Sequence, residues 1–386
     1  MGGASRRAIA AAAIATALSA AAAPAYAQTT RFASPSGTNA DPCTQADPCD
    51  LITATDSSVV PGDVVRMVGG APPGPPFAMG PDQVFVGDNI TLRGAAGARP
   101  VITSSAAAPG ILLLGPGSVA RDLVLEYSGA SLLGALALQP GALAERVEID
   151  SATTGCRLVH GTTIRDSVCS GAQHGVLAEP TDTAAVNLRN VTAVGDIHGI
   201  NADTGGAGSR TVNATNVIAF GGSDVDDRDI RAQNGMLAVN LDFSNWNSQL
   251  ATAPATITDQ DDAGSVGNVA LPPVFVNPAG GDFRQAETSA GTIDRGTATG
   301  LLAGELDFEG DGRFLGAAPD IGADEFVLEP PPSDGSSTST VTSTPIAVPT
   351  GEQEAALKRC KRKAKKQDWS KKRLKRCRRN ARKLPV

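Results

Sequence analysis

Aromatic side chains are scarce in this sequence of 386 residues: Phe, Trp and Tyr make up 4% of the chain, against 43 Gly and 26 Pro. Large aromatic side chains normally fill much of a broad globular core. Their scarcity argues against a thick core and favours a narrow one built from Ala, Val, Ile and Leu. The length suits one elongated domain or two ordinary ones.

Long apolar runs are also missing after residue 23. The run over residues 8–23 follows two arginines and precedes the small-x-small pattern Ala25-Tyr26-Ala27. This order is typical of a secretory signal peptide, residues 1–27, and the residues around the arginines favour the general export route over the twin-arginine route. No later run approaches the roughly 20 residues of a membrane helix. We therefore predict a secreted, extracellular protein that is associated with the cell surface and has no transmembrane segment.

Lysine is absent from the first 357 residues. Residues 352–386 hold 16 Lys and Arg and 3 Asp and Glu, which leaves 17 basic and 37 acidic residues for the rest of the chain. An acidic body with a basic tail indicates two surfaces with different partners. Outside the cell, we expect the tail to bind anionic polymers of the envelope and no specific nucleic acid. The alternative is a solvated charged end without a ligand.

The interior of the chain repeats with a period of 20 to 26 residues. Six segments alternate apolar and polar positions, and their third residues are Leu123, Val147, Ser167, Val191, Val217 and Leu241. A second series runs through Gly134-Ala135, Gly155-Cys156, Gly175-Val176, Gly199-Ile200 and Asp229-Ile230. Two strands per repeat predict one coil of a β-solenoid, because each coil buries its apolar face against the next. A β-sandwich, the alternative, requires no such register between strands.

Charged residues precede the first series at fixed offsets. Stacked parallel strands lie about 4.8 Å apart, so equivalent positions contact one another. One column should hold Arg121, Glu145 and Arg165, and its neighbour Asp122, Arg146, Asp166, Asn190, Asn216 and Asn240. The charges alternate in sign along both columns. From Asn190 onward, the second column continues as a ladder of side-chain amides. Because strand parity would bury one of the columns, we place both in the turn before the strand.

The ends of this body have patterns of their own. Residues 50–58 predict a short capping helix, because an open solenoid end exposes core and unpaired strand edge. The β-helix is expected over residues 28–326. A disordered linker rich in Pro, Ser and Thr follows over residues 327–351, and a short basic helical hairpin over residues 352–386.

Three stretches together resemble a known family. They are the Pro-Cys pairs and turns of residues 32–63, the coil series, and a closing segment that spans residues 273–278, 281–284, 293–296 and 320–326 with Gly310 and Arg313. Over residues 32–326 the chain is similar to the choice-of-anchor Q proteins, which are pectin-lyase-like proteins of bacterial surfaces. The resemblance implies an all-β, right-handed parallel β-helix of three sheets with a variable C-terminal anchor. It implies no established reaction.

Six cysteines in an exported protein indicate three disulfides. The expected pairs are Cys43 with Cys49, Cys156 with Cys169, and Cys360 with Cys377. The first closes a small loop, the second joins inward positions of one coil, and the third faces across the helical hairpin. Two buried free thiols are the alternative for the second pair.

Two acidic segments suggest calcium as a cofactor. The first consists of Asp224, Asp226, Asp227 and Asp229 beside Arg228 and Arg231, a set able to hold calcium and a uronic acid. The second, Asp307-x-Glu309-x-Asp311, begins like a calcium loop but has Ala318 where the last glutamate is expected. We favour a solvated loop for the first and a turn for the second, so no metal is assigned.

Familiar catalytic motifs are missing, among them the nucleophile elbow, the P-loop and the dinucleotide fingerprint. The residues that would serve an acid–base reaction are His174, His198, Asp226, Asp227 and Arg231. The two histidines lie 24 residues apart, and the repeat explains this spacing without chemistry. We therefore assign no catalytic residue.

The leading interpretation is a non-catalytic surface protein that binds or adheres to cell-envelope or extracellular polysaccharide and is tethered by its basic tail. The alternative is a polysaccharide lyase or glycoside hydrolase that acts on an acidic polysaccharide. A structural coat protein without a specific ligand is a third interpretation. An enzyme would need a groove with clustered acids and at least one basic residue.

Overall fold

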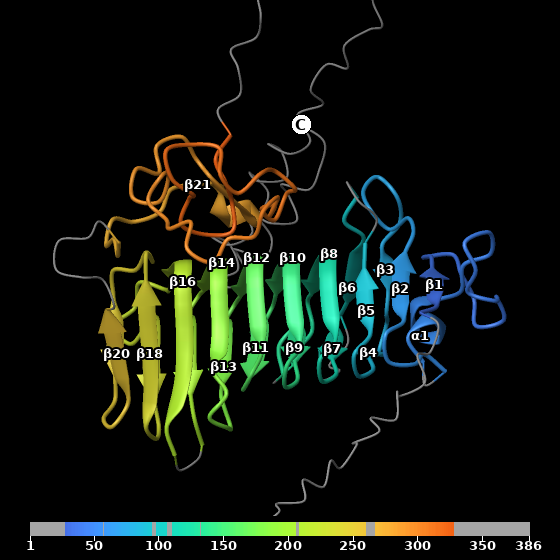
Figure 1. The fold of residues 1–386 in the computed structure, drawn as a ribbon, viewed down its shortest axis with the longest axis horizontal. Coiled ribbons are helices and arrows are strands. Elements are labelled where there is room, and N and C mark those ends of the chain that lie inside the picture. The colour runs from blue at the N-terminus through green and yellow to red at the C-terminus, as the bar shows by residue number, and fades with distance from the viewer. Residues whose placement is uncertain are drawn as a thin grey trace, which may run out of the picture.

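The computed structural model describes residues 28–327, apart from residues 57, 95–97, 106–109, 132, 206–207 and 260–266. The chain winds into a right-handed parallel β-helix whose coils stack along the long axis of Figure 1. Within the described ranges, no helix is long and apolar enough to cross a membrane. The predicted signal peptide, linker and basic tail lie outside the described residues.

Sheet A is a continuous sheet of twelve strands. Its main path runs through β1 (Thr30–Ala33), β2 (Val64–Met67), β5 (Thr91–Arg93), β8 (Val119–Tyr127), β10 (Leu143–Ser151), β12 (Thr163–Gly171), β14 (Val186–Gly195), β16 (Arg210–Phe220), β18 (Leu237–Asp242) and β20 (Thr256–Asp259). Two short strands, β3 (Phe77–Ala78) and β6 (Val101–Ser104), join this path through β8. All of these pairings are parallel, as the stacked coils require.

Sheet B has eight strands, which follow sheet A along the helix axis. They are β4 (Val84–Val86), β7 (Leu112–Leu114), β9 (Leu136–Leu138), β11 (Cys156–Val159), β13 (His174–Glu179), β15 (His198–Asp203), β17 (Arg228–Gln233) and β19 (Gln249–Ala251). In the central coils, one strand of each sheet belongs to each coil. The two-strand repeat predicted from the sequence is therefore confirmed.

Five long strands of sheet A bend at one residue each. The bend column (Asp122, Arg146, Asp166, Asn190 and Asn216) has φ angles between 48° and 59°, a region that Asp and Asn adopt more easily than most residues. β5 pairs with β8 before its bend, and β6 pairs with β8 after it. A coil thus has three faces, but the bend joins two of them. The expected three sheets are therefore two continuous ones.

The predicted columns are present over most of their length. Leu123 pairs with Val147, and Ser167, Val191 and Val217 continue the column in register; all five are fully buried. In the charged columns the signs alternate as predicted from Arg121 to Arg165. The predicted position of the columns, in the turn before the strand, is wrong. The second column lies inside the strand and forms its bend. The left-handed backbone at each bend changes the direction of the side chains, so neither column has to lie in a turn.

Some members of the predicted series were assigned the wrong register. Asn240 pairs with Asn213 and Leu241 with Ala214, so neither continues its predicted column. The cause is the long turn between β16 and β17, which makes this coil longer than its predecessors. In the second series Leu136, not Ala135, pairs with Cys156, because Ala135 adds one residue between Gly134 and β9.

Two of the three predicted disulfides are present. Cys43 is bonded to Cys49, and Cys156 to Cys169 across the core between sheets A and B. The third predicted pair, Cys360 and Cys377, lies outside the described residues. The helix expected over residues 50–58 is the single turn α1 (Leu51–Ala54), where the side chain of Asp50 accepts a hydrogen bond from the amide of Thr53 at 2.7 Å.

Residues 270–327 leave the coils and form the C-terminal module. Its regular elements are β21 (Phe275–Asn277), the 3₁₀ turn η1 (Pro278–Gly280) and β22 (Asp282–Gln285), and the two strands pair antiparallel. Figure 1 shows this module (orange) against the middle coils. The rest of it is turns, so its position depends on side-chain contacts with the β-helix.

Candidate functional site

A groove runs along one edge of the β-helix, where the chain passes from sheet A into sheet B. This turn-edge groove has a volume of about 1350 Å³ and is lined by six successive coils, at residues 128–130, 150–153, 170–173, 194–196, 219–225 with 227–229, and 245–248. Six coils at the strand spacing of about 4.8 Å make it about 24 Å long. The C-terminal module forms the opposite wall, at residues 271–273, 278–281 and 283.

Glycines shape the floor of the groove. Gly171 pairs with Gly195, and Gly221 takes the same place in the next coil. A Cβ atom on Gly195 would lie 1.9 Å from the carbonyl oxygen of His198, so the turn is too tight for any side chain. Ala152 and Ala172 are the neighbours of these turns, so small groups cover this part of the floor.

Aromatic and acidic side chains give the groove its chemical character. Phe220 is 40% exposed and Trp246 is partly buried, and both line the groove together with Phe283 of the C-terminal module. The charged residues of the lining are Asp150, Asp196, Asp224, Asp227, Asp229 and Arg228. Five aspartates and one arginine make this surface acidic, so it repels a polyanion along its length.

The acidic loop predicted as a calcium candidate lies in the long turn between β16 and β17. Asp229 is buried and accepts amide hydrogen bonds from Gly221 at 2.7 Å and from Asn247 and Ser248 at 2.8 Å, so its carboxylate holds the turn together. Asp227 accepts from the amide of Asp224 at 2.9 Å. In the part of the chain that the structure describes, no three His, Cys, Asp or Glu side chains are placed to hold a metal ion. The solvated loop favoured for this segment, without an assigned metal, stays an untested prediction.

The predicted histidines do meet, on the outer face of sheet B. His174 and His198 are paired in register, and their rings stack at 5.3 Å with an angle of 5°. Arg228 is the next residue in their row. Asn201 and Arg231 lie in the adjoining outward row and contact the rings of His174 and His198, each at 3.4 Å. These five residues form the histidine–arginine cluster.

Both rings of this cluster are electrically neutral at neutral pH. Burial, with His198 close by, lowers the pKa of His174 to about 4. Burial and the guanidinium of Arg231 also lower the pKa of His198. Asp227 lines the groove and Asp226 is exposed in the same turn, so the structure does not join all five predicted acid–base residues into one site.

Asn201 is the member of the cluster that sequence reasoning missed. It is 6% exposed and follows Leu177 in the row that leads to Arg231. The signal was available, because Asn201 stands two residues after Gly199 of the predicted second series. The aromatic residues of the groove gave no such signal, since their turns vary in length.

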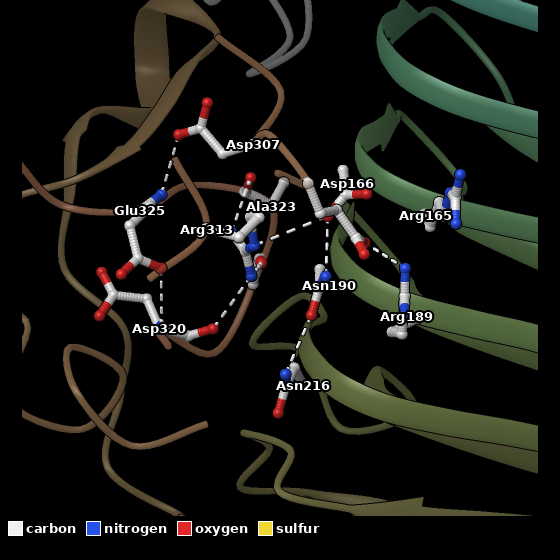
Figure 2. Close-up of polar contacts among 12 residues, drawn as sticks. Arg165, Asp166, Arg189, Asn190, Asn216, Asp307, Arg313, Asp320, Ala323 and Glu325 are labelled. Atoms are coloured by element: carbon white, nitrogen blue, oxygen red, sulfur yellow. Dashed lines mark hydrogen bonds and ion pairs between the residues drawn. The ribbon is translucent and has the colours of Figure 1, made fainter. Parts of the chain in front are cut away.

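The C-terminal module is fixed to the bend column, as Figure 2 shows. The amide of Gly322 donates to the carbonyl of Asn216 at 2.9 Å, and Thr297 exchanges two hydrogen bonds with the Asn216 side chain. From Asn216 a ladder of side-chain hydrogen bonds runs to Asn190 at 2.9 Å and from Asn190 to Asp166 at 2.7 Å. The predicted amide ladder therefore also serves as a docking strip.

Arg313 is the central residue of this interface and is 2% exposed. Its guanidinium donates to the carbonyls of Asp320, Gly322 and Ala323 at 3.0 to 3.2 Å and lies 3.6 Å from the carboxylate of Asp166 (Figure 2). It thereby connects the loop at residues 320–323 of the module to Asp166, the third residue of the bend column. Without Arg313, these acceptors would be buried and only partly satisfied.

Apolar contacts support the same interface. Val168 and Ile218 point outward from sheet A yet are buried, because they pack against Phe275, Phe283, Phe308 and Ile321 of the module. Arg99 adds a contact from an earlier coil, with its guanidinium 5.2 Å from the ring centre of Phe308. The groove wall is therefore anchored by packing as well as by hydrogen bonds.

The module also buries several carboxyl groups. Burial raises the pKa of Asp320 to about 6 and those of Asp324 and Glu325 to about 7, against the opposing effect of the backbone amides that bond to them. Burial also raises the pKa of Asp307, whose Oδ1 accepts amides from residues 309, 310 and 311. These three bonds close the turn at residues 307–311.

No protein-family model matches the chain, and no curated protein matches it. One solved structure, described as the crystal structure of pectate lyase Pel9A, is similar at 13% sequence identity with a TM-score of 0.43, over 78% of this chain and 97% of that chain. The parallel pairing of successive strands identifies the fold without reference to this similarity. It is a parallel β-helix protein with an open groove between its turn edge and a docked C-terminal module.

Proposed function

We propose that the protein is an exported, surface-associated glycan-binding protein that holds an extended, uncharged stretch of polysaccharide in its turn-edge groove. The observation that carries the proposal is the groove itself, which follows six coils and has a glycine floor and aromatic side chains in its walls. A long open groove fits a linear polymer better than a compact ligand. Aromatic surfaces such as Phe220 and Trp246 bury the apolar faces of sugar rings.

The acidic lining favours a neutral polymer over an acidic one, which would be repelled by the five aspartates. This is also the reason to prefer binding over the alternative of a lyase or hydrolase for acidic polysaccharides. The two disulfides fit an oxidising, extracytoplasmic location. The resemblance to choice-of-anchor Q proteins supports attachment at the surface through the C-terminal region.

The binding proposal is tested by filling the groove. Ala172→Trp places an indole on the floor, whereas Ala298→Trp adds the same side chain at an exposed position outside the lining. On an array of neutral and uronic-acid-containing glycans, we expect the wild type and Ala298→Trp to bind neutral glycans. Ala172→Trp should bind at least about tenfold more weakly, a loss of about 1.4 kcal/mol. Equal binding by both variants contradicts the proposal, and so does release of unsaturated uronate from an acidic polymer.

The tether is a separate part of the proposal and has its own test. Residues 352–386 carry 16 Lys and Arg, an array that attracts polyanions of the envelope. Removal of residues 351–386 should move the protein from the cell surface into the medium. A control that replaces the linker with a Gly/Ser segment of equal length should stay on the surface. Unchanged retention of the truncated protein rejects the tether.

A further inference from the structure

The histidine–arginine cluster presents hydrogen-bond donors that face each other. The amide N–H of Arg228 points at Nδ1 of His198 over 3.2 Å. That nitrogen therefore carries the lone pair, and the neutral ring has its proton on Nε2. Nε2 lies 3.4 Å from Nη1 of Arg231. Because arginine has no acceptor, an N–H of the ring and an N–H of the guanidinium meet with no oxygen between them.

Arg231 also lacks a partner for its charge. Its Nε atom is buried without a hydrogen bond, and the ion pairs of the described residues involve other arginines. Arg157 stands in the same outward row of sheet B but donates from Nε to Glu179 at 2.5 Å. Leaving a buried donor unsatisfied is unfavourable. Arg157 therefore has a carboxylate partner, whereas Arg231 has none among the described residues and can pair with the charge of an anionic ligand.

The cluster is held in place before any ligand arrives. His198 is 2% exposed, and its ring is fixed between the stacked ring of His174 and the amide of Arg228. Asn201, which is 6% exposed, has a side-chain oxygen without a partner and contacts His174. Arg231 and His174 keep partial exposure at the surface of the sheet. A small group can therefore reach the guanidinium of Arg231 from solvent, and His198 Nε2 lies beside it.

We propose that the histidine–arginine cluster is a binding site for a single oxyanion, a carboxylate or sulfate group, on the outer face of sheet B. One oxygen would accept from His198 Nε2 and Arg231 Nη1 together, and a second would accept from Arg231 Nη2 on the same edge of the guanidinium. Such charge-assisted bonds to a planar guanidinium are among the stronger polar contacts in proteins. Only Arg228 is shared with the lining of the turn-edge groove, so this site does not depend on the function proposed for the groove.

The chain contains three histidines, which makes imidazole NMR a direct test. At pH 7.5 the wild-type protein is titrated with sodium acetate or sodium sulfate, and sodium chloride keeps the ionic strength constant. We expect saturable shifts of the Hε1 resonances of His174 and His198 in at least one titration. His160, whose ring bonds to Thr181 at 2.6 Å, should not move. Saturation by acetate or by sulfate identifies the kind of group that the site takes, and silence in both titrations overturns the proposal.

Two matched variants locate the site. Arg231→Gln should weaken the apparent affinity at least about tenfold, whereas Arg157→Gln should titrate like the wild type. Saturation should also raise the pKa of His198 in the wild type, because proton and anion binding are linked reciprocally. Melting temperatures establish that the variants are folded, and Arg231→Lys replaces Arg231→Gln if that variant fails to fold. An unchanged titration in the Arg231 variant contradicts the assignment.

Discussion

Removing the guanidinium of Arg313 should detach the C-terminal module from the β-helix. The substitution Arg313→Met keeps the length and apolar volume of the side chain. It leaves three carbonyls without their donor and Asp166 without its nearby cation. Leaving a buried acceptor without its donor costs about 1–3 kcal/mol, so the loss of the donor to three carbonyls should destabilise the protein by about 3–5 kcal/mol. The 2% exposure of Arg313 makes it a buried donor of this kind.

Arg284→Met is the matched control, since it removes an arginine of the same module whose side chain is 46% exposed beside Asp282. Exposed pairs contribute about 0–1 kcal/mol. Urea unfolding at pH 7, followed by tryptophan fluorescence and circular dichroism, measures both variants. Chymotrypsin digestion shows whether the module is released before the coils unfold. An Arg313→Met protein within about 1 kcal/mol of the wild type would refute the docking argument.

Asp166→Asn separates the charge from the hydrogen bonds. Burial raises the pKa of Asp166 against the opposing effect of the Arg313 guanidinium. The equivalent positions in the next two coils are Asn190 and Asn216. An asparagine at residue 166 can therefore continue the ladder. We expect a change of less than about 1 kcal/mol, well below the effect of Arg313→Met.

Two further predictions concern the groove floor and the pH dependence of the module. In urea unfolding, Gly195→Ala should destabilise the protein by about 3 kcal/mol or more, because the added Cβ would overlap the carbonyl of His198. The control Gly205→Ala adds a Cβ in open space, so its free energy of unfolding should stay within about 0.5 kcal/mol of the wild type. Acids with a raised folded-state pKa, such as Asp324 and Glu325, bind more protons when folded, so their contribution is complete below the unfolded pKa and is lost as pH rises through about 7. Between pH 5 and pH 8 the free energy of unfolding should fall by at least about 1.4 kcal/mol; a rise would contradict these shifts.

The sequence was most informative where one coil repeats the last. Leu123, Val147 and Val191 could be aligned by counting, because parallel stacking makes equivalent residues neighbours. The same counting placed His174 and His198 one repeat apart, where their rings stack, and placed Cys156 and Cys169, which are bonded, at inward positions of one coil. It failed at Asn240, where the long turn after β16 changed the length of the coil. Turn lengths are set by contacts that a periodic pattern does not contain.

By itself the sequence determined the β-helix, its register over the regular coils and the row that brings His174 beside His198, because these follow from periodicity and from the spacing of stacked strands. Only the tertiary structure decided where the C-terminal module docks. Arg313 meets Asp166 across 147 positions of the chain, and no local pattern joins them. The turn-edge groove depends on this docking, because the docked module forms the wall that faces the turns of the coils. Its length follows from the repeat, and its width and aromatic walls follow from long-range packing.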